Sequence, residues 1–284
     1  MEFTRLKRPR CAAVVALLAI AFMAAPRAQE SSGDDARRKN FDQILDLYVR
    51  DGEVYYRALK LERAKLDGFV SAIGSESIDK RTREERLAFW LNAYNALVLR
   101  TVIDHYPIQG KSADYPAKSI RQVPGAFERL PHRVAGRTLT LDQIEQTILP
   151  EFRDPRVYLA LGRGAASSGR LRSEAFAPQN IDAQLTEAAA ECVTRARCFN
   201  LDRATGKISI NSIFSWREKE WVDAYADKAP PPFVNRSPIE RAVLAFVWPK
   251  LLTTEKEYLE KNTLQVVYMP FDWTLNDLTG RGGR

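Results

Sequence analysis

The chain has 284 residues, of which 45% are hydrophobic and 28% charged, and its formal net charge is +7. This is enough apolar material for one sizeable core or two small ones, and we favour one because no repeat or long linker divides the chain. Lysine and arginine are scattered among aspartate and glutamate without a dense basic patch, so nucleic acid is not an expected partner.

Residues 1–28 have the pattern of a cleavable signal peptide. A basic stretch ends at Arg10, an apolar run extends from Cys11 to Ala25, and the small Ala28 stands at the expected cleavage position. A membrane anchor is the less favoured alternative, because the run is shorter than the ~20 residues that span a bilayer. We expect a periplasmic or secreted protein with no membrane span after cleavage. The segment carries five basic residues and one acidic residue, so cleavage would lower the net charge from +7 to +3.

The expected mature chain begins with a polar segment, residues 29–40, which has no apolar periodicity and which we predict to be a flexible leader. A single domain is predicted over residues 41–278. A flexible tail is predicted over residues 279–284.

A long helix is predicted to begin at Thr82, because Thr82 and Glu85 have the spacing of a capping box, and to end before Pro107. Its apolar residues point in nearly every direction, which predicts that the helix is buried. Asn92 and Asn95 lie three residues apart on one face. Their amides must then find partners inside the protein, since an unsatisfied buried polar group costs about 1–3 kcal/mol.

Residues 138–149 are predicted to form a short strand that leads into a helix, with Thr140 and Gln143 in capping-box register and Pro150 ending it. On that helix Asp142, Glu145 and Gln146 share one face. The next run, residues 156–161, is β-prone and is predicted to be a strand. It leads into a small-residue loop, residues 162–169, and a loop after a strand is a common position for a functional site.

The remaining segments predict further helices over residues 182–195 and 213–224 and from Ser237 onward, with strands over residues 208–210 and 265–269. Helices dominate and do not alternate regularly with strands. The pattern predicts an α+β fold, a helix-rich single domain with a small, mainly antiparallel sheet.

Two cysteines, Cys192 and Cys198, remain after the expected cleavage. An oxidising compartment would allow a disulfide between them, and two free thiols are about equally compatible with the sequence. A continuous helix over both residues would separate them by about 9 Å, so a disulfide requires the helix to end between them.

Five segments, taken in chain order, carry a family resemblance: residues 88–96 (Ala-Phe-Trp-Leu-Asn-Ala-Tyr-Asn-Ala), 139–145 (Leu-Thr-Leu-Asp-Gln-Ile-Glu), 154–156 (Asp-Pro-Arg), 213–216 (Ile-Phe-Ser-Trp) and 268–276 (Tyr-Met-Pro-Phe-Asp-Trp-Thr-Leu-Asn). Together they resemble the domain of unknown function 547 family over roughly residues 41–276. Members of that family have no settled biochemical role, so the resemblance restricts the possible folds more than the possible functions.

The chain departs from the family pattern at four positions. Similar sequences usually have a His where Gln146 stands, commonly a His where Tyr158 stands, and two cysteines that align with Arg163 and Ser168. If the family uses thiol chemistry, the resemblance implies that this member lacks both the nucleophile and its base. The resemblance therefore implies a degenerate site.

Other chemistries have weak support. The two histidines, His105 and His132, are not close in sequence, and the two remaining cysteines are too few for a zinc site, so we expect no metal and no cofactor. The glycines of the loop are spaced like those of a phosphate loop, but Arg170 and Leu171 replace the required Lys and hydroxyl residue. The five tryptophans invite a sugar-binding interpretation, although core packing is the default for them.

Our leading interpretation is an exported, pseudoenzyme-like domain that binds an unknown small molecule or an envelope protein by hydrogen bonding. The expected ligand-binding residues are Asn92, Asn95, Glu145, Gln146, Arg163, Ser167 and Ser168. One alternative is a hydrolase or transferase with Ser168 as the nucleophile and Glu145 as the base. A second alternative is a purely structural envelope protein, which would need no cleft.

Overall fold

The computed structural model describes residues 27–278 together with Met1. Residues 2–26 of the predicted signal peptide and residues 279–284 of the predicted tail lie outside the described residues.

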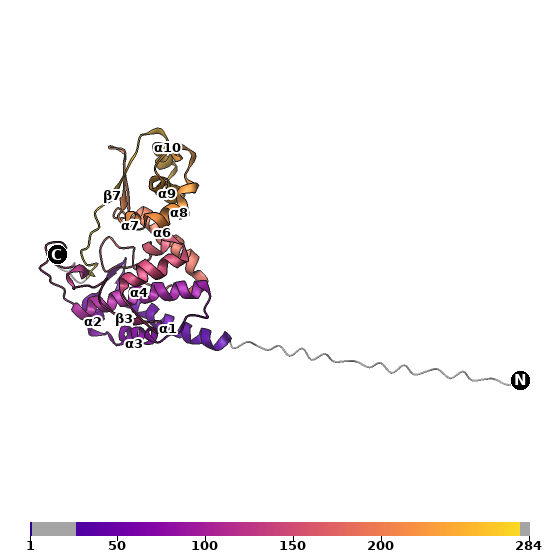
Figure 1. Ribbon diagram of the computed structural model, residues 1–284, viewed down its shortest axis with the longest axis vertical. Coiled ribbons are helices and arrows are strands. Elements are labelled where there is room, and N and C mark those ends of the chain that lie inside the picture. The colour runs from indigo at the N-terminus through magenta and orange to yellow at the C-terminus, as the bar shows by residue number, and fades with distance from the viewer. Residues whose placement is uncertain (2–26, 279–284) are drawn as a thin grey trace.

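Helices make up most of the described chain (Figure 1). The α-helices are α1 (Arg27–Tyr48), α2 (Tyr56–Leu61), α3 (Ala64–Gly74), α4 (Arg83–His105), α5 (Leu141–Gln143), α6 (Ile181–Thr194), α7 (Ile213–Trp216), α8 (Glu218–Tyr225), α9 (Pro238–Val247) and α10 (Thr253–Lys261). Short 3-10 turns and one π-helical turn, η2, connect them: η1 (Ile120–Gln122), η2 (Ile144–Ile148), η3 (Leu149–Phe152), η4 (Pro155–Leu159), η5 (Pro178–Asn180), η6 (Ala226–Lys228), η7 (Pro231–Phe233) and η8 (Trp248–Lys250).

The strands form three small sheets. Two antiparallel pairs are β1 (Val49–Arg50) with β2 (Glu53–Val54) and β3 (His132–Val134) with β4 (Arg137–Leu139). The third sheet has the order β5 (Phe199–Asp202), β6 (Lys207–Asn211) and β7 (Gln265–Met269), with β6 antiparallel to β5 and parallel to β7. The predicted helix-rich α+β fold is confirmed, but the strands are divided among separate sheets and the largest sheet is mixed.

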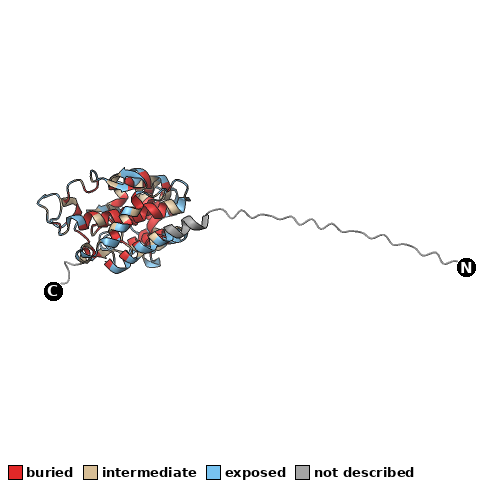
Figure 2. Ribbon diagram, turned by 90° about the horizontal axis from the view of Figure 1, so that it is seen from below, coloured by how far each residue is buried: buried red, intermediate tan, exposed pale blue. Residues whose placement is uncertain are grey.

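Helix α4 runs through the core, and Figure 2 shows it as the most continuously buried helix in that view. Thr82 caps it with the predicted capping box, and the side chains of Leu91, Tyr94 and Leu97 are completely buried. Helices α1 to α4 lie at one end of the molecule and α7 to α10 with β7 at the other, with α6 between them (Figure 1). The chain then returns beside β2, where the Val54 N–H donates to the Asn276 carbonyl at 2.9 Å. The core is therefore one continuous cluster that extends from Phe41 to Leu275.

The predicted flexible leader, residues 29–40, differs in the structure, where it belongs to helix α1. The later part of α1 buries Phe41, Ile44, Leu45 and Tyr48 at helical spacing. That packing stabilises the helix, and the preceding polar residues contain no proline to end it. Among the described residues, no helix combines the length and the apolar character that crossing a bilayer requires.

The predicted strand over residues 156–161 is wrong, because this segment forms the 3-10 turn η4. The Asp154 carboxylate accepts the N–H of Arg156 at 3.1 Å, and Pro155 in the first turn has the φ that a helical turn needs.

The bounds of two predicted helices differ in the structure. The helix predicted to end at Pro150 continues as η3 with Pro150 in its first turn, and the helix predicted over residues 213–224 is divided into α7 and α8 at Arg217.

Candidate functional site

The two asparagines of α4 act as clamps on the backbone of later segments. Asn92 donates to the Phe176 carbonyl at 2.9 Å and accepts the Phe176 N–H at 2.8 Å. Asn95 donates to the Ala160 carbonyl at 3.2 Å and accepts the Gly162 N–H at 2.8 Å. Both amides thus find the internal partners that their burial requires, and they orient the chain on either side of the loop over residues 162–169. These hydrogen bonds give both side chains a structural role, and Asn92 also lines a separate cavity of about 220 Å³.

Glu145 forms a buried ion pair with Arg163. Glu145 lies on η2, the π-helical turn, a conformation that is rare and frequent at functional sites. Its Oε1 accepts from Arg163 Nη2 at 2.6 Å, and its Oε2 accepts from Arg163 Nε at 3.1 Å and from the Tyr94 hydroxyl at 2.9 Å. Glu145 is 6% exposed and Arg163 2% exposed. This bidentate pair is therefore held inside the protein by α4, η2 and the loop together.

The pair determines the charge state of its members. Burial would raise the pKa of Glu145, but the charge and hydrogen bonds of Arg163 and the Tyr94 hydroxyl outweigh burial and hold that pKa below its ordinary value. Burial and the charge of Glu145 raise the pKa of the Tyr94 hydroxyl well above its usual range. Glu145 is thus a permanent carboxylate at neutral pH, and Tyr94 remains a neutral donor to it.

Arg217, which separates α7 from α8, organises a second polar network beside this pair. Its guanidinium donates to Gln146 Oε1 and, at 2.5 Å, to the Tyr158 hydroxyl, and it forms an ion pair with Glu220 at 2.5 Å. The guanidinium carbon also lies 4.2 Å from the centroid of the Tyr158 ring. Arg217 is 5% exposed, so its charge depends on these internal partners.

The four positions at which the chain departs from the family pattern are therefore connected in space. Arg217 joins Gln146 to Tyr158, and Arg163 Nη1 donates to the Tyr158 carbonyl at 3.1 Å. The backbone N–H of Arg163 donates to Ser168 Oγ at 3.0 Å. Hydrogen bonds centred on two arginines thus link all four positions.

A cavity of about 190 Å³ opens above the Glu145–Arg163 pair, and we call it the aromatic pocket. Its lining combines charged, amide and aromatic side chains: Arg121, Phe127, Asp142, Glu145, Gln146, Arg163, Trp216 and Trp273. Three expected site residues, Glu145, Gln146 and Arg163, thus meet in one cavity.

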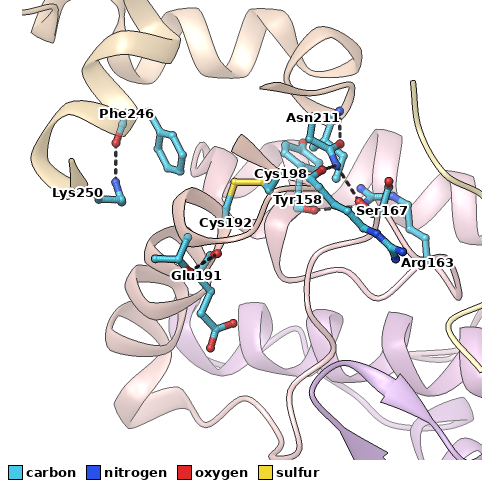
Figure 3. Close-up of a disulfide and its surroundings, with 12 residues drawn as sticks. Tyr158, Arg163, Ser167, Glu191, Cys192, Cys198, Asn211, Phe246 and Lys250 are labelled. Carbon is cyan, nitrogen blue, oxygen red and sulfur yellow. Dashed lines mark hydrogen bonds between the residues drawn. A yellow bond between two sulfur atoms is a disulfide. The ribbon is translucent and has the colours of Figure 1, made fainter. Parts of the chain in front are cut away.

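The loop over residues 162–169 is fastened to the C-terminal segment. The Ser167 N–H donates to the Asp272 carbonyl at 3.1 Å, and the Asp272 N–H donates back to Ser167 Oγ at 3.0 Å. Asn211 donates to the Ser167 carbonyl at 2.9 Å (Figure 3). A side chain at Gly169 would place its Cβ 1.8 Å from the Leu159 carbonyl oxygen, so this position requires glycine. Ser167 is therefore part of the internal bracing of the loop.

Ser168 lies on another cavity. This cavity of about 310 Å³, which we call the arginine cavity, is lined by Ser168 and by Arg170, Arg195 and Arg197. Cys198 also lines it, and the structure joins Cys192 and Cys198 in a disulfide with a Cα–Cα distance of 5.1 Å (Figure 3). Helix α6 ends at Thr194, between the two cysteines, as the disulfide requires.

A comparison with protein-family models matches residues 78–193 to the family described as a protein of unknown function, DUF547. The chain is thus similar to that family over this segment. Neither the comparison with curated proteins nor that with solved structures finds a match. The segment that matches the DUF547 model contains Glu145, Gln146 and Arg163 and ends before Trp216 and Trp273. The aromatic pocket is thus built partly from the DUF547 segment and partly from the chain that follows it.

Metal-ligating side chains are dispersed in the described part of this protein. Within residues 27–278, no group of three or more His, Cys, Asp or Glu side chains is placed to hold a metal ion. The His105 ring forms a hydrogen bond with the Thr101 carbonyl at 2.9 Å near the end of α4. Burial lowers the pKa of His132, which lines a different cavity together with His105. Neither histidine lines the aromatic pocket.

Several residues of the site were not predicted from the sequence. Arg121 and Arg217 carry no motif, and Tyr94 lies in the 88–96 segment but was not selected. Long-range packing brings Arg121 to the pocket, Tyr94 to Glu145 and Arg217 to Gln146. Trp216 and Trp273 did carry a signal, because both lie in segments that resemble the DUF547 pattern, but we assigned them to the core by default. Trp216 is exposed at the cavity, which corrects the assignment for that residue, whereas Trp273 lines the cavity and also packs against the core.

Proposed function

We propose that this protein is an exported ligand-binding domain, that the aromatic pocket is its binding site, and that the site binds by hydrogen bonding and aromatic packing without proton transfer. The observation that carries this proposal is the state of Glu145, which lies at an open cavity with both carboxylate oxygens already engaged.

A general base needs a free lone pair within reach of its proton and a pKa near the working pH. Glu145 does not have such a pKa, because Arg163 and Tyr94 lower it, and their three hydrogen bonds already occupy most of its lone pairs. Gln146 has an amide that does not titrate near neutral pH, and its Oε1 is held by Arg217. The lining therefore offers fixed donors and acceptors around an open space, which is the arrangement of a binding site.

Export is the second part of the proposal, and it depends on the predicted signal peptide. The Cys192–Cys198 disulfide supports it, since structural disulfides persist in the periplasm and outside the cell and are rare in the cytosol. We therefore propose a periplasmic or secreted location.

The two alternatives have less support. Glu145 lines the aromatic pocket and Ser168 the arginine cavity, and the Ser168 hydroxyl accepts a backbone N–H. A serine nucleophile with Glu145 as its base therefore lacks the hydrogen bond that defines such a pair. A purely structural envelope protein would need no cavity lined by polar and aromatic groups together.

The proposal is tested by saturation-transfer NMR on the purified protein with a defined mixture of methyl glucoside, N-acetyltryptophanamide, benzoate and tetramethylammonium. We expect at least one compound to bind the wild type and to lose its signal with Trp216→Ala. Arg197→Ala, in the arginine cavity, is the matched control and should leave the signal unchanged. Absence of binding, or binding that depends on Arg197 and not on Trp216, would overturn the proposal.

A further inference from the structure

The five tryptophans have very different surroundings. Trp90 is 2% exposed and Trp221 0% exposed, as expected for core residues, and Trp248 and Trp273 are partly buried. Trp216 is 44% exposed. An indole that remains open to water leaves a large apolar surface unburied, and such surfaces commonly mark binding sites.

Trp216 is exposed but supported from behind. Its ring lies 4.8 Å from that of Phe271 and 6.1 Å from that of Trp273, within 16° of parallel to the latter. Trp273 in turn contacts Phe127 at 5.7 Å, and the Arg121 guanidinium carbon lies 4.5 Å from its centroid. Arg121 and Phe127 thus pack against Trp273, while Trp216 presents the open indole. A rigid aromatic surface loses little entropy when a ligand packs on it.

Two polar side chains at the same pocket remain available. Asp142 is half-buried, and its carboxylate has no hydrogen-bond or ion-pair partner within the part of the chain that the structure describes. Gln146 is exposed, and only its Oε1 is engaged, by Arg217, so its amide N–H groups remain free to donate among the described residues. Asp142 and Gln146 are four residues apart, which places them on one face of the helical segment. The pocket therefore offers one acceptor and one donor beside the open indole.

The charges of the lining select against anions. Arg121 and Arg163 carry two positive charges and Asp142 and Glu145 two negative charges, so the lining sums to zero. Glu145 is neutralised by Arg163, and Arg121 forms an ion pair with Glu128. Asp142 is then the lining charge without a partner among the described residues, so an anionic ligand would meet an uncompensated carboxylate. A neutral molecule with hydroxyl groups avoids this repulsion and can donate to Asp142.

We infer that the aromatic pocket binds a neutral sugar ring. Such a ring has an apolar C–H face that packs on an indole, and its hydroxyl groups both donate to a carboxylate and accept from an amide. The cavity of about 190 Å³ accommodates about one such ring and is open to solvent, so further rings of a glycan can extend outward. This inference rests on the proposed function and adds the ligand class to it.

The test is isothermal titration of the purified protein with three neutral oligosaccharides, namely cellotetraose, maltotetraose and N-acetylchitotetraose, alongside their methyl monosaccharides. We expect at least one oligosaccharide to bind. Trp216→Ala should weaken that binding about tenfold or more, because the apolar face loses its support, and Trp216→Phe should restore part of it. Asp142→Asn should weaken it by about ten- to hundredfold, because a charged acceptor is lost.

Two controls make the outcome specific. Arg197→Ala, in the arginine cavity, should leave oligosaccharide binding within about twofold of the wild type, and circular dichroism of each variant checks that the fold is retained. Oligosaccharide binding that survives both Trp216→Ala and Asp142→Asn would place the sugar elsewhere and overturn the inference.

The failure of this inference can be told from the failure of the proposed function. If no oligosaccharide binds while another compound of the four-component mixture binds in a Trp216-dependent manner, the sugar class is wrong and the pocket remains a binding site. If neither the oligosaccharides nor the mixture bind, both proposals are wrong.

Discussion

The loop over residues 162–169 contributes to two cavities of different character, one with an aromatic lining and one lined by three arginines with Asp51 and Glu53. The aromatic pocket receives Arg163, has a lining that sums to zero charge, and contains the exposed Trp216. The arginine cavity receives Ser168, contains Arg170, Arg195 and Arg197, and is bordered by Cys198 of the disulfide. Five residues of sequence thus separate two chemical environments, and residues that are neighbours in a motif do not form one site here.

The difference lies in how each side of the loop is held. On the side of the aromatic pocket, a buried ion pair and two arginine-centred networks fix the charged groups. On the other side, Arg170 shares the exposed Asp51 with Arg195, and the ion-pair distances are 3.1 and 3.8 Å. Exposed pairs of this kind contribute about 0–1 kcal/mol, whereas removing one partner of a buried pair costs about 3–5 kcal/mol. Variants on the two sides should therefore differ in the size of their effects.

The largest expected effect is that of Glu145→Gln. The substitution keeps the shape of the side chain but leaves the Arg163 guanidinium buried without its counter-charge, so the free energy of unfolding should fall by about 3–5 kcal/mol. Urea denaturation followed by tryptophan fluorescence measures it. Glu151→Gln makes the same chemical change at an exposed position of η3 and should alter stability by about 0.5 kcal/mol or less. Equal effects of the two variants would contradict the buried pair.

The same pair predicts a pH dependence. Because the pKa of Glu145 is lower in the folded protein than its ordinary value of 4.5, its stabilisation is fully present above that value and is lost as the pH falls through the lowered pKa. The difference in unfolding free energy between wild type and Glu145→Gln should thus stay constant from neutral pH to about pH 5.5 and shrink below about pH 4. A difference that is independent of pH down to strongly acidic conditions would show that Glu145 does not supply the stabilising charge.

An intermediate effect is expected from removing the disulfide with Cys192→Ala and Cys198→Ala together. The bridge closes a loop with a sequence separation of 6, so its loss should lower the free energy of unfolding by roughly 2 kcal/mol. Binding at the aromatic pocket should be unchanged, because Trp216, Asp142 and Gln146 have no contact with the bridge. A parallel loss of ligand binding would show that the two cavities are coupled through the loop.

Local signals in the sequence were sufficient for elements whose ends depend on nearby residues. The capping boxes at Thr82 and Ser237 mark the starts of α4 and α9, and β7 has the bounds that its β-prone residues predict. The segment over residues 156–161 shows the limit of this approach. Its β-prone residues are helical because Asp154 and Pro155 cap a turn that tertiary packing then buries.

The site was predictable only in part. Glu145, Gln146 and Arg163, to which residue type and the family pattern pointed, line one cavity. The residues that contact them were not predictable. Arg217 lies 71 residues after Gln146, and Trp273 lies 57 residues after its neighbour Trp216. Sequence periodicity carries no information over such separations. Asn92 and Asn95 were predicted to need internal partners, and the structure supplies them from backbone segments that periodicity could not identify.

The smallest effect is expected from Ser168→Ala, and it tests the separation of the two cavities most directly. Ser168 Oγ accepts only the Arg163 N–H among the described residues, so its loss should lower the free energy of unfolding by about 1 kcal/mol. Ser167→Ala, which frees the Asp272 N–H, is the matched control and should cost at least as much, because Ser167 is the more buried of the two. Neither variant should differ from the wild type in a broad ester and amide hydrolysis screen.

That screen decides between the two cavities. Hydrolysis that is present in the wild type and in Ser167→Ala but absent in Ser168→Ala would assign catalysis to the arginine cavity, with a base other than Glu145. Without such turnover, the Ser168 hydroxyl acts only as an acceptor that fixes the Arg163 backbone. The Arg163 side chain pairs with Glu145 and keeps it charged. By fixing the Arg163 backbone, Ser168 would then stabilise the aromatic pocket from the opposite side of the loop.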